Sequence, residues 1–213
     1  MDHSEHWEQQ YTTRAETTVG WFEAVPAISL RRIREAVAAG ARSLIDVGGG
    51  ASRLIDNVLD IGLERLAVVD IAESGLAIAR ERLGVRAARV EWIVGDVTEL
   101  QDVGRFDIWH DRAVFHFLVE AADRNRYVAL AERTVNLGGF AVMATFAPDG
   151  PDRCSGLPVR CYEPRDLAAE CGPAFALLDS ERYLHTTPNG VPQRFAYSTF
   201  RRVARDREHV SAG

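Results

Sequence analysis

The chain has 213 residues, 46% of them hydrophobic, and a net charge of −6 at pH 7. This length is enough for one α/β domain with a sizeable core and a small elaboration. Nucleic acids and anionic membranes select basic surfaces, so the acidic balance argues against either one as the main partner. Lysine is absent from the sequence, which excludes a Schiff base or a lysine general base.

The sequence gives no sign of export or of a membrane span. No apolar run approaches the roughly 18 residues that a membrane-spanning helix needs, and the polar N-terminus lacks the apolar core of a signal peptide. We therefore expect a cytoplasmic protein. The cysteines Cys154, Cys161 and Cys171 lack CxxC spacing, so they predict neither a disulfide framework nor a metal site.

The first 40 residues have helical patterns. Apolar side chains between 28 and 38 recur with the spacing of one helix face, and Gly40 is suited to end that helix. We expect residues 1–40 to form a helical cap on the rest of the chain.

From residue 43 onward, apolar runs alternate with helix-like segments, which predicts a parallel sheet covered on both faces. The expected strands are 43–48, 65–71, 90–96, 106–111 and 140–146, and the expected helices are 52–60, 73–83, about 113–137 and 164–171.

After residue 174 the pattern changes to two extended segments joined by a turn signal at residues 187–190. This predicts an antiparallel hairpin at the edge of the sheet. The expected fold is a seven-stranded, doubly wound α/β sheet that is mostly parallel, with helices on both faces. We expect one domain, with the cap at 1–40, the core at 41–205 and a polar tail at 206–213.

A glycine turn follows the first expected strand. Gly48-Gly49-Gly50 lets the backbone turn tightly with room for a ligand against it, and Asp46 lies just before it. Asp70 ends the second strand twenty residues after Gly50, where a carboxylate can accept both hydroxyl protons of a ribose. These positions predict an adenine nucleoside as the ligand.

Two residues favour S-adenosylmethionine over a nicotinamide dinucleotide. Arg53 stands where a dinucleotide fingerprint has its third glycine. The Asp46 carboxylate would repel a pyrophosphate and attract a cation, and S-adenosylmethionine carries an ammonium and a sulfonium but no phosphate.

Five segments resemble, in order, the motifs of class I S-adenosylmethionine-dependent methyltransferases. They are DVGGGAS (46–52), VVDI (68–71), VGDV (94–97), FDIWHDR (106–112) and NLGGFAV (136–142). The resemblance covers about residues 43–203 and implies a Rossmann-like fold and S-adenosylhomocysteine as product. It implies that the residues binding the cofactor are Asp46, Val47, Gly48, Gly50, Asp70, Ile71, Asp96 and Val97. Each aspartate alone could instead be a strand-end or helix-entry charge, but three consecutive strand ends favour a ligand site.

The segment IWHDRAVFHFL, residues 108–118, is also similar to the W-D-R-x-A-L segment of thiopurine-type methyltransferases, with His110 as an extra residue. We expect His110, Asp111 and Arg112 to be catalytic, between the methionine end of the donor and the acceptor. Arg112 could hold an anionic acceptor, and His110 or His116 could take a proton. Alternatively, Asp111 and Arg112 fix the loop and His116 is a core residue.

Other acceptor contacts are expected from the N-terminal cap, from residues 146–162 and from the C-terminal hairpin segment 184–200. Residues 146–162 are rich in Pro and Gly and predict an ordered lid that carries Cys154. The predicted contacts to the acceptor are Trp21, Phe22, His116, Cys154 and His185. The alternatives are packing for the aromatic residues and Cys154, and contacts within the hairpin for His185.

We therefore predict a methyltransferase with a small-molecule acceptor, first a thiol or other soft nucleophile, with a carboxylate or hydroxyl nearly as favoured. One alternative is a protein lysine methyltransferase whose groove uses Trp21, Phe22 and Asp149. Another is an NAD-dependent oxidoreductase or a non-catalytic nucleoside-binding module. The sequence allows either a monomer or a homodimer.

Overall fold

The computed structural model describes residues 3–205, and its centre is a seven-stranded sheet in the order β3-β2-β1-β4-β5-β9-β8. The strands are β1 Ser43–Val47, β2 Arg65–Asp70, β3 Glu91–Val94, β4 Phe106–Arg112, β5 Val135–Phe146, β8 Phe175–Thr186 and β9 Pro192–Arg202. The first five pair in parallel, whereas β9 runs antiparallel to both of its neighbours, β5 and β8. This confirms the predicted mixed sheet with a C-terminal hairpin. The predicted tail at 206–213 lies outside the described residues.

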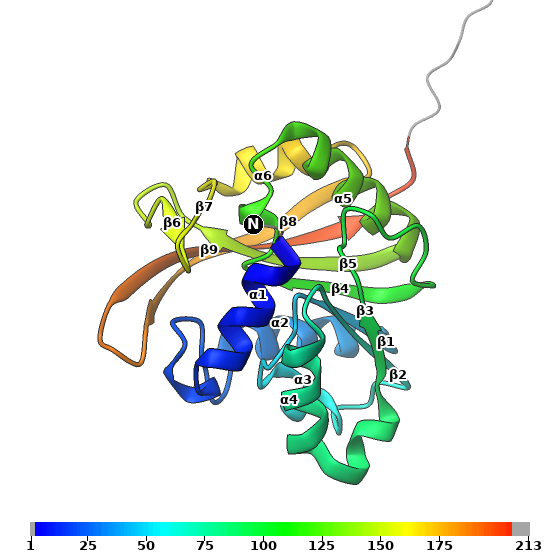
Figure 1. Ribbon diagram of the computed structural model, residues 1–213. Coiled ribbons are helices and arrows are strands. Elements are labelled where there is room, and N and C mark those ends of the chain that lie inside the picture. Colours follow the sequence, from blue (N-terminus) through cyan, green and yellow to red (C-terminus); the bar gives the residue numbers. More distant parts are fainter. Residues whose placement is uncertain (1–2, 206–213) are drawn as a thin grey trace, which may run out of the picture.

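Helices cover both faces of the sheet, as predicted (Figure 1). They are α1 His3–Thr13, α2 Ala27–Ala38, α3 Leu54–Val58, α4 Glu73–Leu83, α5 Ala121–Thr134 and α6 Pro164–Cys171. Helices α5 and α6 lie on one face, α2 to α4 lie on the other, and α1 crosses in front between the two layers. In residues 3–205 no helix has the length and apolar character that crossing a membrane requires.

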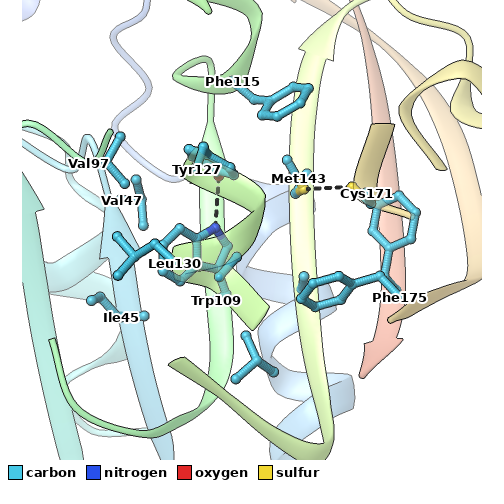
Figure 2. Close-up of a cluster of buried hydrophobic side chains, with 14 of the residues drawn as sticks. Ile45, Val47, Val97, Trp109, Phe115, Tyr127, Leu130, Met143, Cys171 and Phe175 are labelled. Atoms are coloured by element: carbon cyan, nitrogen blue, oxygen red, sulfur yellow. Dashed lines mark hydrogen bonds between the residues drawn. The ribbon is translucent and has the colours of Figure 1, made fainter. Parts of the chain in front are cut away.

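Each face has its own hydrophobic core, because successive side chains of a strand point to opposite sides. Ile45 and Trp109 pack with α5 and α6, whereas Leu44 and Ile108 pack with α2 and α3. In the first core, the indole Nε1 of Trp109 donates to the hydroxyl of Tyr127 at 2.8 Å (Figure 2). Cys171 is buried there against Met143, which agrees with a packing role.

Two expected element boundaries are wrong. The helix expected at about 113–137 is a loop, a 3-10 turn at Phe115–Phe117, and then α5. Ala113 has a φ of +73°, which no helix tolerates, so the chain cannot continue from β4 directly into a helix. The strand expected from 140 begins at Val135, and Gly138, with a φ of +79°, lies in a register shift inside it.

Smaller differences lie near the ligand-binding edge. Helix α3 spans only Leu54–Val58 instead of 52–60. The expected lid contains a two-stranded hairpin of β6 Arg153–Cys154 and β7 Leu157–Pro158. A further 3-10 turn, Glu16–Thr18, follows α1 in the cap.

Candidate functional site

A cavity of about 220 Å³ lies at the carboxyl ends of the parallel strands. Its floor comes from the ends of β1, β2 and β4 and from the segment after β3, which is the usual ligand edge of an open α/β sheet. The lining residues include Val47, Gly48, Asp70, Ile71, Asp96, Val97, Arg112, Val114, Phe117 and Cys154, with Trp7, Tyr11 and Trp21 from the cap.

The glycine turn after β1 is closely packed on all sides. Gly48 and Gly50 have φ values of +64° and +38°, which favour glycine. A Cβ at Gly48 would collide with the side chain of Val114, and one at Gly50 would collide with the hydroxyl of Tyr11. The turn therefore needs glycine for its backbone angle and for its neighbours, and Gly48 faces the cavity whereas Gly50 lies beneath Tyr11.

Asp70, at the end of β2, and Asp96, after β3, lie at the predicted strand ends and contribute to the floor of the cavity. Asp70 is 6% exposed, and its Oδ1 accepts a hydrogen bond from Ala72 N at 2.9 Å. Burial, with the nearby charges of Asp46 and Glu8, raises the pKa of Asp70 to about 7. Asp96 Oδ1 accepts hydrogen bonds of 2.7 Å from the backbone N and the hydroxyl of Thr98.

These residues fit the adenosine part of the predicted donor. Asp70 presents a carboxylate to the cavity, as a ribose diol requires, and Asp96 lies beyond it. Ile71 and Val97 supply apolar walls beside them, which suit the faces of a purine. Among residues 3–205, no three His, Cys, Asp or Glu side chains converge as a metal site would need.

Aromatic side chains from the cap form a roof over the cavity. Trp7 meets Trp21 and Phe117 edge-on, with ring centroids 5.6 and 5.2 Å apart. Tyr11 also meets Trp21, at 6.1 Å. Sequence reasoning did not select Trp7 or Phe117. The four-residue spacing of Trp7 and Tyr11 puts both on one face of α1, and this was the available signal for Trp7.

His110 does not reach the cavity, so the prediction that it lies beside the acceptor is wrong. It pairs in register with Asp46 of β1, and both side chains point to the face covered by α2. His110 Nδ1 is 2.7 Å from Asp46 Oδ1, and its Nε2 is 2.8 Å from Ser29 Oγ of α2. Asp46 likewise does not line the cavity; it lies beneath the glycine turn, against Gly49.

Asp111 is completely buried and fixes the loop after β4, which was the alternative interpretation. Its carboxylate accepts hydrogen bonds from the backbone N–H groups of Val114 and Phe115, at 2.8 and 3.0 Å, and from the hydroxyl of Tyr127. Burial raises the pKa of Asp111 to about 6. The expected catalytic contact of Asp111 is wrong, because all its interactions are with the chain itself and it does not line the cavity.

His116 and His185 are also buried away from the cavity, which corrects their predicted contact with the acceptor. His116 Nδ1 accepts a long hydrogen bond of 3.4 Å from Phe146 N, and burial together with Arg112 lowers its pKa to about 3. His185 contacts the cap instead, through Gly20 O at 2.8 Å. Phe22 lies outside the main cavity and borders a small neighbouring one.

Arg112, Trp21 and Cys154 line the cavity, and their roles toward an acceptor stay predictions. Arg112 Nη1 donates to the carbonyl of Trp21 at 2.8 Å, which ties the roof to the end of β4. Cys154 comes from β6 in the lid segment, and burial raises the pKa of its thiol to about 11. The thiol is therefore neutral near pH 7.

Comparison with known proteins relates part of the chain to a known family. Residues 44–139, which run from β1 through the cavity floor into β5, match the model of the methyltransferase domain family. Comparison with curated proteins gives no match.

Several solved structures share the fold of this chain. The N-methyltransferase NodS from Bradyrhizobium japonicum, in complex with S-adenosylhomocysteine, has a TM-score of 0.71 at 13% identity over 94% of this chain and 99% of that one. The 1,6-didemethyltoxoflavin-N1-methyltransferase from Burkholderia thailandensis has a TM-score of 0.69 at 22% identity, over 94% and 85%. A structure concerned with conversion of a disulfide bond into a thioacetal group during echinomycin biosynthesis has a TM-score of 0.77 at 15% identity, over 95% and 93%.

Proposed function

We propose that this chain is a class I S-adenosylmethionine-dependent methyltransferase, with S-adenosylhomocysteine as coproduct, and that it acts on a small molecule whose accepting atom is a thiol sulfur or another soft nucleophile. The observation that carries the proposal is that the groups close to Arg112 which could act as a base are not available. Asp111 and His116 are held inside the protein, and the thiol of Cys154 is neutral. The titratable lining residues His3, Glu120 and Asp123 lie at the N-terminal ends of α1 and α5. An acceptor beside Arg112 must therefore be nucleophilic without a base from the end of β4 or from the lid.

A thiol meets this condition better than an alcohol. A free thiol has a pKa of about 8.5, so a useful fraction is ionised near neutral pH, whereas an aliphatic alcohol needs a base. The donor supplies a methyl group already activated by its sulfonium, so the protein's part is to align the two molecules and keep water out. The thioacetal structure described above indicates that sulfur chemistry is compatible with this fold.

The donor would occupy the floor of the cavity. We assign ribose binding to Asp70, adenine contacts to Ile71, Asp96 and Val97, and the methionine end to the turn of Val47 and Gly48. Gly50 would act through the close packing of that turn. Asp46 would act from beneath it, since its carboxylate pairs with His110 rather than facing the cavity.

The roof favours a small acceptor. The cavity of about 220 Å³ lies below the usual range of roughly 300–1,000 Å³ for ligand pockets, and the donor would fill much of it. Trp7, Tyr11 and Trp21 cover the remainder. We therefore propose that the cap and the core act as one domain, with the cap enclosing the reacting atoms.

The test is methyl transfer to three matched ring compounds, thiophenol, phenol and aniline, with methylated product measured by mass spectrometry. We expect turnover with thiophenol and little with the other two. Asp70→Asn should lose turnover, whereas Asp102→Asn, at an exposed carboxylate that does not line the cavity, should keep it. Transfer to phenol or aniline but not thiophenol, or only to proteins in a cell lysate, would contradict the soft acceptor. Failure to bind S-adenosylhomocysteine would contradict the donor site itself.

A further inference from the structure

Three ionisable side chains meet behind the acceptor end of the cavity. They are Glu23 from the cap, Arg112 from the end of β4, and His185 from β8, and we call them the charge cluster. Glu23 Oε1 lies 3.3 Å from Arg112 Nη2 and 3.1 Å from His185 Nδ1. All three side chains are largely buried, at 9%, 11% and 3% exposure, so water screens their charges poorly.

His185 links the Glu23 carboxylate to the backbone of the cap. Its Nε2 lies 2.8 Å from the carbonyl oxygen of Gly20, which can only accept a hydrogen bond, so Nε2 carries a proton. Its Nδ1 lies 3.1 Å from the carboxylate of Glu23. His185 therefore helps to position Glu23 beside Arg112.

Glu23 is the ionised partner in the cluster. Burial opposes its ionisation, but the contacts with His185 and Arg112 outweigh burial and lower the pKa of Glu23. Its neighbours Tyr183 and Tyr197 stay neutral, because burial raises the pKa of Tyr183 to about 12 and raises that of Tyr197 as well.

Glu23 satisfies the Arg112 guanidinium only in part. Its Oε1 lies 3.3 Å from Arg112 Nη2 without forming a hydrogen bond. The other groups that feel Arg112 add no anion, because the Cys154 thiol and the His116 ring are neutral. Buried donors that lack an acceptor are strongly unfavourable, so Arg112 can take a second anionic partner from the cavity.

Arg112 is the member that can present this charge to a ligand. It lines the cavity, and its buried Nε and Nη2 make no hydrogen bond within the chain. Its guanidinium lies 5.5 Å from the ring centroid of Phe195 on β9. In the sheet order, β9 lies beyond β5, whereas Asp70 ends β2 on the opposite side of β4. Arg112 therefore points to the acceptor side and away from the adenosine site.

We propose that the acceptor is an anion, such as a carboxylate-bearing thiol, and that Arg112 binds its negative charge with Glu23 and His185 as positioning residues. This rests on the proposed function and narrows its substrate class. Arginine offers two parallel N–H donors to a carboxylate, and the Nε and Nη2 of Arg112, which lack hydrogen bonds within the chain, form such a pair. The acceptor would satisfy these donors, and the nearby Glu23 carboxylate limits how strongly the acceptor is held.

The test is binding of three aromatic probes that differ only in charge, benzoate, benzyl alcohol and benzylamine, to protein saturated with S-adenosylhomocysteine. Isothermal titration calorimetry should show that benzoate binds about tenfold or more tightly than the other two, as one charge-assisted contact predicts. Arg112→Gln should remove this preference. Arg32→Gln, at a buried arginine that is paired with Asp179 and Glu181 outside the cavity, should keep it.

Glu23→Gln separates the charge argument from a structural role. It removes the competing carboxylate at nearly constant shape, so the affinity for benzoate should rise while that for benzyl alcohol stays the same. Weaker binding of every probe would mean that Glu23 only supports the fold, and would overturn the proposal. Equal binding of the three probes to the wild type would also overturn it, while leaving the proposed function intact as long as S-adenosylhomocysteine binds.

The second possible source of the anion is the donor's own carboxylate. S-adenosylhomocysteine carries that group and 5′-methylthioadenosine lacks it, so the two ligands distinguish the sources. We expect Arg112→Gln to leave the affinity ratio of these ligands unchanged. A selective loss of S-adenosylhomocysteine affinity would place Arg112 at the donor and overturn the proposal.

Discussion

Replacing Asp70 with asparagine should stabilise the ligand-free protein while weakening donor binding. Burial raises the pKa of Asp70 from 3.8 to about 7, so the folded state favours the protonated form. At pH 8 the carboxylate is ionised in the folded and unfolded states, and the folded state carries the desolvation cost. A pKa shift of one unit corresponds to roughly 1.4 kcal/mol. The shift of Asp70 therefore lowers the free energy of unfolding at pH 8 by about 4 kcal/mol at most.

The dependence on pH has a definite sign. Between about pH 4 and 7 the folded state holds a proton on Asp70 that the unfolded chain has lost. The contribution of Asp70 to the free energy of unfolding therefore falls as pH rises through this window and levels off above it. Asparagine does not titrate, and its side-chain oxygen can still accept the hydrogen bond from Ala72 N. The free energy of unfolding of the variant should therefore exceed that of the wild type most at pH 8 and least at pH 4.

The assay is thermal unfolding followed by circular dichroism from pH 4 to pH 9, together with calorimetric binding of S-adenosylhomocysteine. We expect Asp70→Asn to raise Tm at pH 8 by several degrees, since 1 kcal/mol corresponds to about 2–4 °C for a chain of this size, and to weaken binding about tenfold or more. Asp102→Asn is the matched control, because Asp102 accepts the same kind of backbone bond, from Gly104 N at 2.8 Å, at an exposed position. A lower Tm for Asp70→Asn at pH 8, or a Tm difference from wild type that does not vary with pH, would refute the reasoning.

Two further substitutions test the packing around the site. Tyr127→Phe removes the buried hydroxyl that donates to Asp111 and should reduce the free energy of unfolding by about 2–3 kcal/mol in a denaturant titration. Tyr162→Phe is the control and should change the free energy of unfolding little, because the buried hydroxyl of Tyr162 has no hydrogen-bond partner. Equal losses in the two variants would contradict this account. Gly50→Ala should abolish S-adenosylhomocysteine binding in calorimetry, because the new Cβ collides with the cap. Gly84→Ala has a similar φ of +56° with open space around it, so it should lose stability but still bind, and loss of binding in both variants would show that backbone strain alone is responsible.

Residues at strand ends were predictable because the carboxyl ends of parallel strands meet at one edge of the sheet. Asp70 and Asp96 were selected on this basis, and both line the cavity. Arg112 was also selected, and as the last residue of β4 it reaches the same edge. For these residues, the order of apolar runs and turns was enough to predict a shared location.

The side on which each strand residue points was not predictable. Asp46 and His110 face α2, while their neighbours Val47 and Asp111 face the opposite way. In a strand exposed on one face, alternating polarity reveals the buried side. Here both faces are covered by helices, so successive residues of β1 and β4 are buried on both sides, and their polarity does not alternate in a way that shows which face each residue points to.

The sequence by itself determined the mixed α/β sheet, the glycine turn and the acids at the strand ends, because local periodicity and turn chemistry encode them. Only the tertiary structure decided which titratable groups form contacts inside the protein and so do not reach the cavity. His110 is buried against Asp46, and Asp111 accepts hydrogen bonds from the loop after β4. Glu23 and His185, which are about 160 residues apart in the chain, meet beside Arg112. Such pairings depend on long-range packing, which gives no periodic signal along the chain, and they decide which charges remain for a ligand.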